Sequence, residues 1–327
     1  MEAEHRAEFA DIQTAYQRIR HQVVETPLLE SKTLSAMSGG HVYLKCENLQ
    51  HTGSFKFRGA SNAILGLETD QRKLGVVSYS SGNHAQGVAC AAKLAGIRST
   101  IVMPEDAPAD KIANTRSHGA DVVLYHRYRE SREQIGADLS ASTGAHLIRP
   151  YDDYAVIQGQ GTAGLECANQ LKARALQPDA MIICCGGGGL SAGCGVAMRA
   201  IFPDIDLFLA EPAAFDDYGR SLSTGQRQTN DPESRSICDA IVTPTPGELT
   251  FPIVKKHFKA GLSANDGMVK DAVKLLYTNH RIIAEPGGAI AVACFLKNID
   301  AFRGKAVVLM ISGGNIDPSL LQNIIST

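Results

Sequence analysis

The chain has 327 residues, of which 44% are hydrophobic and 20% charged, so it can bury one large core or two smaller ones. Its 32 basic and 34 acidic residues give a formal net charge of -2. This balance excludes the strongly basic surface of a nucleic-acid-binding or anionic-membrane-binding protein, so we expect small-molecule partners.

The first six residues are largely charged and lack an apolar signal core, and no apolar run approaches the roughly 20 residues of a membrane span. We therefore expect a cytoplasmic protein with no membrane partner and no nucleic-acid partner. The 8 cysteines are scattered, mostly in apolar runs, which is typical of buried reduced thiols. Their spacing predicts neither a disulfide framework nor a zinc site.

The first predicted element is an amphipathic helix that ends at Thr26-Pro27. Its apolar residues recur three and four positions apart: Phe9, Ile12, Tyr16, Ile19 and Val23. Short apolar runs with the character of strands follow, separated by segments with helical spacing. These runs cover residues 42–46, 76–79, 100–103, 122–125, 181–184, 207–210 and 307–311.

Strands that alternate with helices predict an α/β fold with parallel sheets and crossover helices. Residues 75–150 contain three or four consecutive strand–helix units, which predicts a small domain. Residues 1–74 and 151–327 then form the large domain, and we expect the active site in the cleft between the two. The polar stretch 221–236 is predicted to be a long surface loop.

Lys56 lies in the segment TGSFKFRG, residues 52–59, between Phe55 and Phe57. An apolar, partly desolvated setting favours the unprotonated amine, which can form an imine with an aldehyde cofactor. The alternative is an ordinary solvated lysine. Lys56 together with the glycine run 186–189, the loop 80–84 and Ser312, which are described next, favours pyridoxal phosphate as the cofactor.

Four glycines, Gly186, Gly187, Gly188 and Gly189, follow an apolar run and precede a helix rich in small residues. Such a turn exposes backbone N–H groups at a helix N-terminus and is typical of a phosphate cradle. A dinucleotide fingerprint fits less well, because Glu211 does not have the local pattern of the required acidic residue. A tight structural turn remains the third interpretation.

A second loop joins a predicted strand to a predicted helix and consists of Ser80, Ser81, Gly82, Asn83 and His84. Its N–H groups and hydroxyls could hold a substrate α-carboxylate, and the Asn83 amide could donate to the phenolate oxygen of the cofactor. A simple helix cap is the alternative.

After the run 307–311, Ser312 could hydrogen-bond to the pyridine nitrogen of the cofactor, or it could be another cap.

The segments GSFKFRG and SSGNH, together with the glycine loop and Ser312, resemble those of the serine/threonine dehydratase and serine racemase group of fold-type II enzymes, which use pyridoxal phosphate. The resemblance covers essentially the whole chain. It implies two lobes of open, twisted parallel sheets with the active site between them, and a homodimer.

The same resemblance implies a role for each motif residue. Lys56 would be the Schiff-base lysine, with Phe55 packed on the cofactor ring. Asn83 would bind the 3'-oxygen, and Ser312 the ring nitrogen. The phosphate would be bound by Gly186, Gly187, Gly188, Gly189 and Leu190.

Similar proteins bind a divalent cation through a Glu, a backbone carbonyl and an Asp, and Glu211, Phe215 and Asp217 have this spacing. Oxygen ligands of this kind suit Mg²⁺ or Ca²⁺. An acidic surface loop is the alternative. Ser81 matches the serine that exchanges a proton in racemases of the group, which permits racemisation without requiring it.

Two features bear on the substrate. Relatives carry Ala-Asp-Gly beside the cofactor ring, whereas this chain has Cys238-Asp239-Ala240, and the added methyl could narrow the pocket. Arg132 matches an arginine near the substrate cleft and could bind a second carboxylate, which favours a substrate like 3-hydroxyaspartate. A solvated helix arginine is the alternative.

The predicted reaction is elimination from a β-hydroxy amino acid of the L-threonine or L-serine type, giving a 2-oxo acid and ammonia. The alternatives are a threo-3-hydroxyaspartate dehydratase and an amino-acid racemase that uses Lys56 and Ser81. From another class, a nicotinamide-dependent oxidoreductase or a non-catalytic nucleotide-binding protein could be built on the glycine loop.

Overall fold

The computed structural model describes residues 7–107 and 109–326, and it contains two separate β-sheets. The larger sheet has the strand order β1-β2-β10-β7-β8-β9 and the smaller one β5-β4-β3-β6. Every neighbouring pair is parallel except β1 and β2. The strands are β1 (Leu28–Glu30), β2 (His41–Cys46), β3 (Val76–Tyr79), β4 (Ser99–Pro104), β5 (Asp121–Tyr125), β6 (His146–Ile148), β7 (Ala180–Cys184), β8 (Asp206–Pro212), β9 (Ala260–Ala264) and β10 (Ala306–Ile311).

Helices cover the sheets and occupy most of the remaining chain. The α-helices are α1 (Phe9–Ile19), α2 (Lys32–Ser38), α3 (Lys56–Leu65), α4 (Thr69–Leu74), α5 (Asn83–Leu94), α6 (Ala109–Ser117), α7 (Arg132–Thr143), α8 (Tyr154–Ala173), α9 (Gly189–Ile201), α10 (Asp217–Thr224), α11 (Thr250–His257), α12 (Asp266–Leu275), α13 (Pro286–Lys297) and α14 (Pro318–Ser326). Short 3-10 or π turns are η1 (Glu47–Leu49), η2 (His51–Gly53), η3 (Asp239–Ile241), η4 (Leu276–His280) and η5 (Ile299–Phe302). In the described part of the chain, no helix is both long enough and apolar enough to cross a bilayer.

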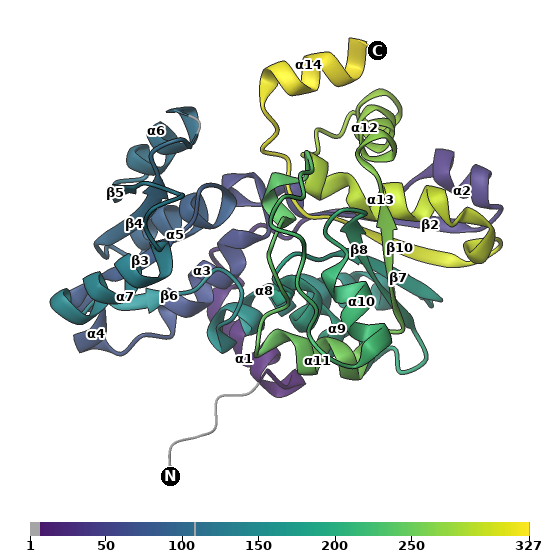
Figure 1. The fold of residues 1–327 in the computed structure, drawn as a ribbon. Coiled ribbons are helices and arrows are strands. Elements are labelled where there is room, and N and C mark those ends of the chain that lie inside the picture. Colours follow the sequence, from purple (N-terminus) through teal and green to yellow (C-terminus); the bar gives the residue numbers. More distant parts are fainter. Residues whose placement is uncertain (1–6, 108, 327) are drawn as a thin grey trace.

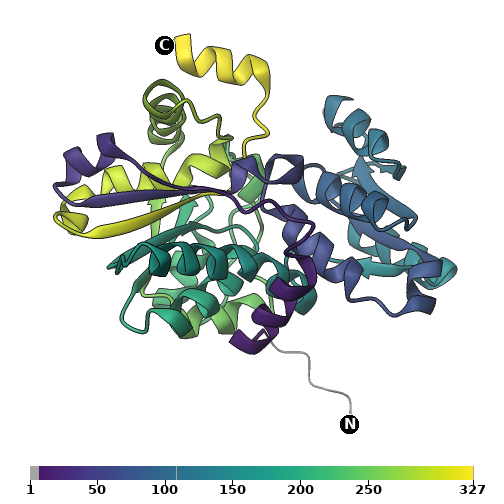
Figure 2. The same cartoon turned by 180° about the vertical axis from the view of Figure 1, so that it is seen from behind.

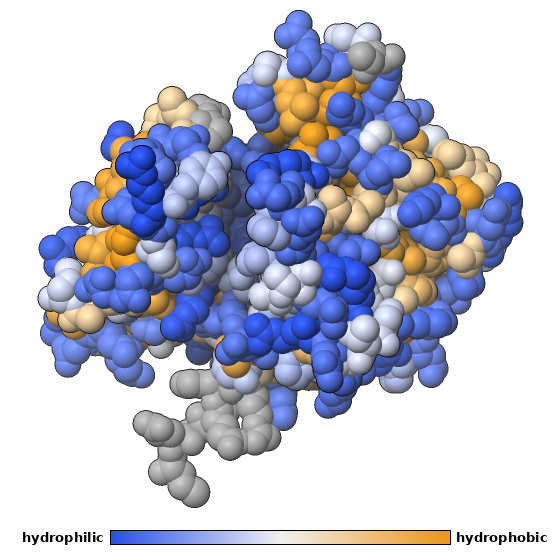
Figure 3. All heavy atoms as spheres, in the orientation of Figure 1, coloured by the Kyte–Doolittle hydropathy of each residue, from blue (hydrophilic) through white to orange (hydrophobic). Residues whose placement is uncertain are grey.

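The two sheets lie side by side, each with its own helices (Figures 1 and 2). Strands of the larger sheet are buried on both faces. Val42 in β2, Ile182 in β7 and Leu309 in β10, for example, are fully buried in its core. Burial on both faces explains why these strands are continuous apolar runs rather than alternating ones. The space-filling view shows a hollow between the two halves of the molecule (Figure 3).

Helix α3 connects the two halves. Phe57 and Ala60 belong to the apolar core of the smaller sheet, and α3 also packs along α8. The helices approach closely, since a Cβ at Gly159 would lie 2.7 Å from the Arg58 carbonyl oxygen. The Arg58 guanidinium, fully buried, donates to Glu47 and Glu166. This buried ion cluster fixes the helix that begins at Lys56.

The α/β class and the parallel sheets agree with the prediction from sequence. The domain boundaries stay a prediction: all four strands of the smaller sheet lie within residues 76–148, whereas α3, which precedes residue 75, shares the core of that sheet. Residues 1–6, the basis of the cytoplasmic expectation, lie outside the described part of the chain, as do residues 108 and 327.

Two element boundaries differ from the prediction. Helix α1 ends at Ile19 instead of continuing to Thr26. The Gln50 side chain accepts from the Val24 N–H and donates to the Val24 carbonyl, so these backbone groups are not available to a longer helix. Residues 221–224 are helical rather than loop: α10 continues to Thr224 and ends at Gly225, which has a left-handed φ of 76°.

Candidate active site

One pocket lies at the carboxyl ends of strands from both sheets, where the loops after β3, β7 and β10 meet. Ligand sites in open parallel sheets are expected at such ends. The structure brings together in this pocket every residue that the sequence predicted for catalysis, cofactor binding and substrate binding. They are Phe55, Lys56, Ser80, Ser81, Gly82, Asn83, His84, Arg132, Gly186, Gly187, Gly188, Gly189, Leu190, Ala240 and Ser312.

Lys56 is the first residue of α3 and its side chain reaches into the pocket. The preceding chain is fixed beside β10, since the Phe55 N–H donates to the Ser312 carbonyl at 3.1 Å. The Lys56 amine donates to the Pro150 carbonyl at 2.8 Å. Burial lowers the pKa of the amine to about 8, although Cys184 and Glu285 nearby raise it. A substantial fraction is therefore neutral and nucleophilic near physiological pH.

The glycine loop forms a cradle at the N-terminus of α9. Gly188 is the cap residue with a φ of 90°, and the first N–H groups of α9 have no partner within the helix. The helix dipole adds positive potential there, as an anion site requires. Side chains are excluded, because a Cβ at Gly187 would overlap the Tyr151 ring and one at Gly188 would overlap the Tyr218 hydroxyl.

The Asn83 amide has a fixed orientation. Its nitrogen donates to Glu285 at 2.6 Å, while its oxygen accepts from the Asn315 amide at 2.8 Å. The Asn315 nitrogen also donates to the Thr52 carbonyl at 2.8 Å. With its oxygen already occupied, Asn83 has one N–H left to offer a ligand, which suits a phenolate oxygen.

Glu285 was missed by the reasoning from sequence. Its carboxyl is buried, and burial is the main reason why its pKa is raised to about 7. The nearby Asp239 carboxylate also raises this pKa, whereas the hydrogen bond with Asn83 lowers it. In the sequence it simply precedes Pro286 at the start of α13, a position where an acidic residue is common for structural reasons. Only the fold brings it to Asn83.

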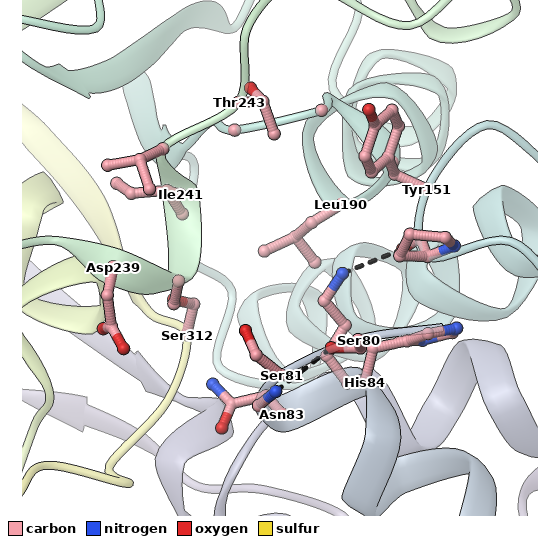
Figure 4. A pocket seen from close by; sticks show the side chains of 18 of the residues that line it. Ser80, Ser81, Asn83, His84, Tyr151, Leu190, Asp239, Ile241, Thr243 and Ser312 are labelled. Atoms are coloured by element: carbon pink, nitrogen blue, oxygen red, sulfur yellow. Dashed lines mark hydrogen bonds between the residues drawn. The ribbon is translucent and has the colours of Figure 1, made fainter. Parts of the chain in front are cut away.

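The substrate side of the pocket contains polar atoms without partners. The His84 Nδ1 and the Thr243 hydroxyl are both buried and accept or donate no hydrogen bond within the described residues. Burial and the Lys56 charge lower the pKa of His84 to about 3, so its ring is neutral. The two residues enter from different segments of the pocket wall (Figure 4). Orphaned polar atoms of this kind indicate a polar ligand.

Arg132, the first residue of α7, lies with its guanidinium 5.5 Å from the centre of the Tyr79 ring. Its Nε donates to Glu133 at 2.8 Å, and its terminal nitrogens have no hydrogen-bond partner among the described residues. Lys111 and Asp239 form an ion pair of 3.0 Å that joins α6 to η3 at the pocket.

Further pocket residues were given no role from the sequence, because they form no motif of their own: Tyr79, Lys111, Pro150, Tyr151, Cys184, Ile241, Val242, Thr243 and Glu285.

The predicted cation ligands lie outside this pocket. Both Glu211 oxygens accept backbone N–H groups, from Tyr218 at 2.9 Å and Gly219 at 2.8 Å. Asp217 accepts from Asn230 through one oxygen, and its other oxygen is buried without a partner. The described residues hold no group of three or more His, Cys, Asp or Glu side chains suited to a metal. Since the predicted set of Glu211, the Phe215 carbonyl and Asp217 has only two carboxylates, the cation stays a prediction.

Comparison with known proteins decides the family. Residues 19–313 match the family model described as "Pyridoxal-phosphate dependent enzyme". The chain belongs to this family. It is 42% identical over 309 residues to the L-threo-3-hydroxyaspartate ammonia-lyase of Pseudomonas sp, a match that covers 94% of this chain and 95% of that protein.

Solved structures show the same fold over the same length. A threonine deaminase from T.th. superposes with a TM-score of 0.90 at 40% identity, over 95% of this chain and 99% of that one. The serine racemase of Dictyostelium discoideum gives a TM-score of 0.88 at 38% identity, over 95% and 99%. The predicted fold-type II architecture and the predicted cofactor are thereby confirmed.

The residues of the pocket fit pyridoxal phosphate. The glycine cradle offers N–H groups to a phosphate, and Lys56 offers an amine to an aldehyde. Asn83 has a free donor for the phenolate oxygen, and the Ser312 hydroxyl at the end of β10 is a neutral partner for the ring nitrogen. These assignments to single residues stay predictions, since the family alone does not test them.

Proposed function

We propose that the protein is a pyridoxal-phosphate-dependent ammonia-lyase that eliminates water from a β-hydroxy amino acid and releases a 2-oxo acid and ammonia. The observation that carries the proposal is the Lys56 amine, with its lowered pKa, in one pocket with the glycine cradle and the Asn83 donor. Relatives named L-threo-3-hydroxyaspartate ammonia-lyase and L-threonine ammonia-lyase, at 39 to 42% identity, support it.

The bound cofactor supplies the electron sink for negative charge at Cα. Lys56 then takes the α-proton, for which an amine with a pKa of about 8 is well suited. The loop of Ser80, Ser81 and Gly82 presents the first N–H groups of α5 to the substrate α-carboxylate. Ser312 would hold the ring nitrogen of the cofactor as a neutral partner, which would not stabilise a full positive charge there and would favour rapid loss of the β-hydroxyl.

We further propose that the preferred substrate carries a second carboxylate, as 3-hydroxyaspartate does. Arg132 lines the pocket and uses only its Nε for Glu133, so its two terminal nitrogens can bind a carboxylate through parallel hydrogen bonds. Relatives from Pseudomonas and Saccharomyces cerevisiae, 42% and 40% identical, bear the name of such an enzyme.

Racemisation is a second candidate, which Ser81 favours. It lines the same pocket as Lys56, and a relative from Dictyostelium discoideum named serine racemase is 39% identical. Chiral analysis of the amino acid separates the two reactions: the lyase proposal requires that 2-oxo acid form faster than the D-amino acid.

The test is release of 2-oxo acid from L-serine, L-threonine, both diastereomers of 3-hydroxyaspartate and phenylserine. We expect the highest kcat/KM for a 3-hydroxyaspartate diastereomer. Lys56→Ala should lower the turnover of every substrate by roughly 10³-fold or more, because it removes both the cofactor link and the base. If no substrate releases 2-oxo acid above the Lys56→Ala background, the lyase proposal is wrong.

The homodimer also stays a proposal. Leu29, Leu49 and Ile283 are exposed by 41%, 52% and 47% on the half of the molecule that contains the larger sheet. Their exposure is compatible with a partner surface, and sedimentation equilibrium would measure the mass.

A further inference from the structure

A second cleft adjoins the catalytic pocket and shares a wall with it. The shared residues are Tyr79, Arg132, Pro150 and Tyr151. Pro150 is the residue whose carbonyl holds the Lys56 amine, and Tyr151 packs over the glycine cradle. The two spaces are therefore separated by side chains that also shape the catalytic site.

The ionisable residues of the second cleft include three arginines and three acidic residues: Arg132, Arg149, Arg227, Glu133, Asp152 and Glu248. The acids already have partners. Glu133 accepts from Arg132 at 2.8 Å, and Glu248 accepts from Arg227 at 3.1 Å. Asp152 accepts the Glu248 and Leu249 N–H groups at the start of α11, at 3.0 and 2.8 Å.

Arg149 differs from the other two arginines, since no ion pair or hydrogen bond of its guanidinium is found within the described residues of the cleft. It follows the last residue of β6, and the parallel register pairs Ser78 with Ile148. Arg149, directly after β6, is thus next to Tyr79, the last residue of β3, at the same end of the smaller sheet. Burial and then the Glu133 carboxylate raise the pKa of the Tyr79 hydroxyl, whereas Arg149 and Arg132 both act in the opposite direction. Both guanidinium groups therefore lie near Tyr79, which lines both clefts.

We propose that the second cleft favours dicarboxylic amino acids by electrostatic attraction: Arg149 is its unpaired cation, and it acts on the distal carboxylate that Arg132, on the shared wall, binds in the catalytic pocket. A fixed cation beside the catalytic pocket raises the local concentration of amino acids with a net negative charge, such as those with a second carboxylate, without taking part in the chemistry. Arg149 is exposed and hydrated, so its effect should be on ligand binding and should weaken with salt. The inference rests on the proposed preference for dicarboxylic substrates.

The test uses the holoenzyme and two unreactive ligands. L-Aspartate has the second carboxylate but no β-hydroxyl to eliminate, and L-alanine has neither. Inhibition constants of both are measured against dehydration of L-serine or L-threonine, in the wild type and in Arg149→Gln. We expect the substitution to raise the inhibition constant of aspartate about three- to tenfold relative to that of alanine. Arg149→Lys, which keeps the charge, should stay close to the wild type.

Added salt should weaken aspartate inhibition in the wild type more than in Arg149→Gln, a response that a merely structural role would not produce. Arg129→Gln is the matched control, because Arg129 is exposed and lines neither cleft. The inference is overturned if Arg149→Gln shifts aspartate and alanine equally, or if Arg129→Gln shifts aspartate as much.

These outcomes are separable from the substrate preference itself. If 3-hydroxyaspartate is turned over well but Arg149→Gln has no selective effect, the second cleft does not attract the distal carboxylate and the proposed function stands. If 3-hydroxyaspartate is a poor substrate while aspartate inhibition still depends on Arg149, the role of the second cleft stands and the substrate preference is wrong.

Discussion

The two sides of the catalytic pocket are built differently. The phosphate end of the cofactor side is backbone: Gly187 and Gly188 present N–H groups, and neighbouring rings exclude any side chain there. The substrate side consists of charged side chains from separate elements, such as Arg132 on α7 and Lys111 on α6. A backbone cradle accepts one ligand shape, whereas side chains can be exchanged without changing the fold. We therefore expect the first side to set the chemistry and the second to set the choice of amino acid.

Gly187→Ala should weaken cofactor binding, and so affect every substrate alike. The added methyl overlaps the Tyr151 ring, and overpacking of this kind costs about 1–3 kcal/mol. We expect the Kd of the cofactor to rise by roughly 10- to 100-fold. Fluorescence titration of the apoprotein measures it. Gly267→Ala, in α12 and away from the pocket, is the control; equal cofactor affinity in Gly187→Ala and Gly267→Ala would show that the loop is not the cradle.

Arg132→Gln would change the substrate side alone. Losing hydrogen bonds to a charged group costs about 1.5–3 kcal/mol, so kcat/KM for 3-hydroxyaspartate should fall roughly 10- to 100-fold relative to L-serine. The cofactor affinity should change far less than in Gly187→Ala. A parallel fall for both substrates would mean that Arg132 holds the fold rather than the second carboxylate.

The residues of the cofactor side could be predicted from the sequence almost completely, because they form contiguous motifs. Residues 186–190 lie between a strand and a helix, and the cradle can be inferred from that order alone. The predicted strand 76–79 coincides with β3, and Lys56 begins a helix. Short strands with little apolar character, such as β6 and β9, gave no comparable signal.

The substrate side could not be assembled from sequence. Glu285 meets Asn83 across 202 positions, and Tyr151 reaches the glycine loop only because β6 ends beside β3. Single residues that are brought together by tertiary structure leave no pattern of spacing. The end of α1 was misplaced for the same reason, since the distant Gln50 sets it.

Glu285 lies in the pocket beside Asn83, and its protonation should affect the free energy of unfolding. Its folded pKa of about 7 lies above its unfolded value of 4.5, so the folded state binds the extra proton between these pH values. This stabilisation is complete below pH 4.5 and is lost as pH rises through 7, by roughly 3 kcal/mol at most.

In Glu285→Gln, the free energy of unfolding should therefore decline less between pH 4.5 and 7 than in the wild type. Urea unfolding of the apoprotein at several pH values measures the difference. Glu233→Gln, an exposed substitution on a loop, should follow the wild type. If the Glu285→Gln curve runs parallel to the wild-type curve, the carboxyl does not titrate in this window.

The most direct test of the central claim is reduction of the holoenzyme with borohydride, followed by peptide mass spectrometry. The account predicts one pyridoxyl-phosphate adduct on the peptide that contains Lys56, the amine held by the Pro150 carbonyl. No adduct, or an adduct on Lys111 in place of Lys56, would contradict it.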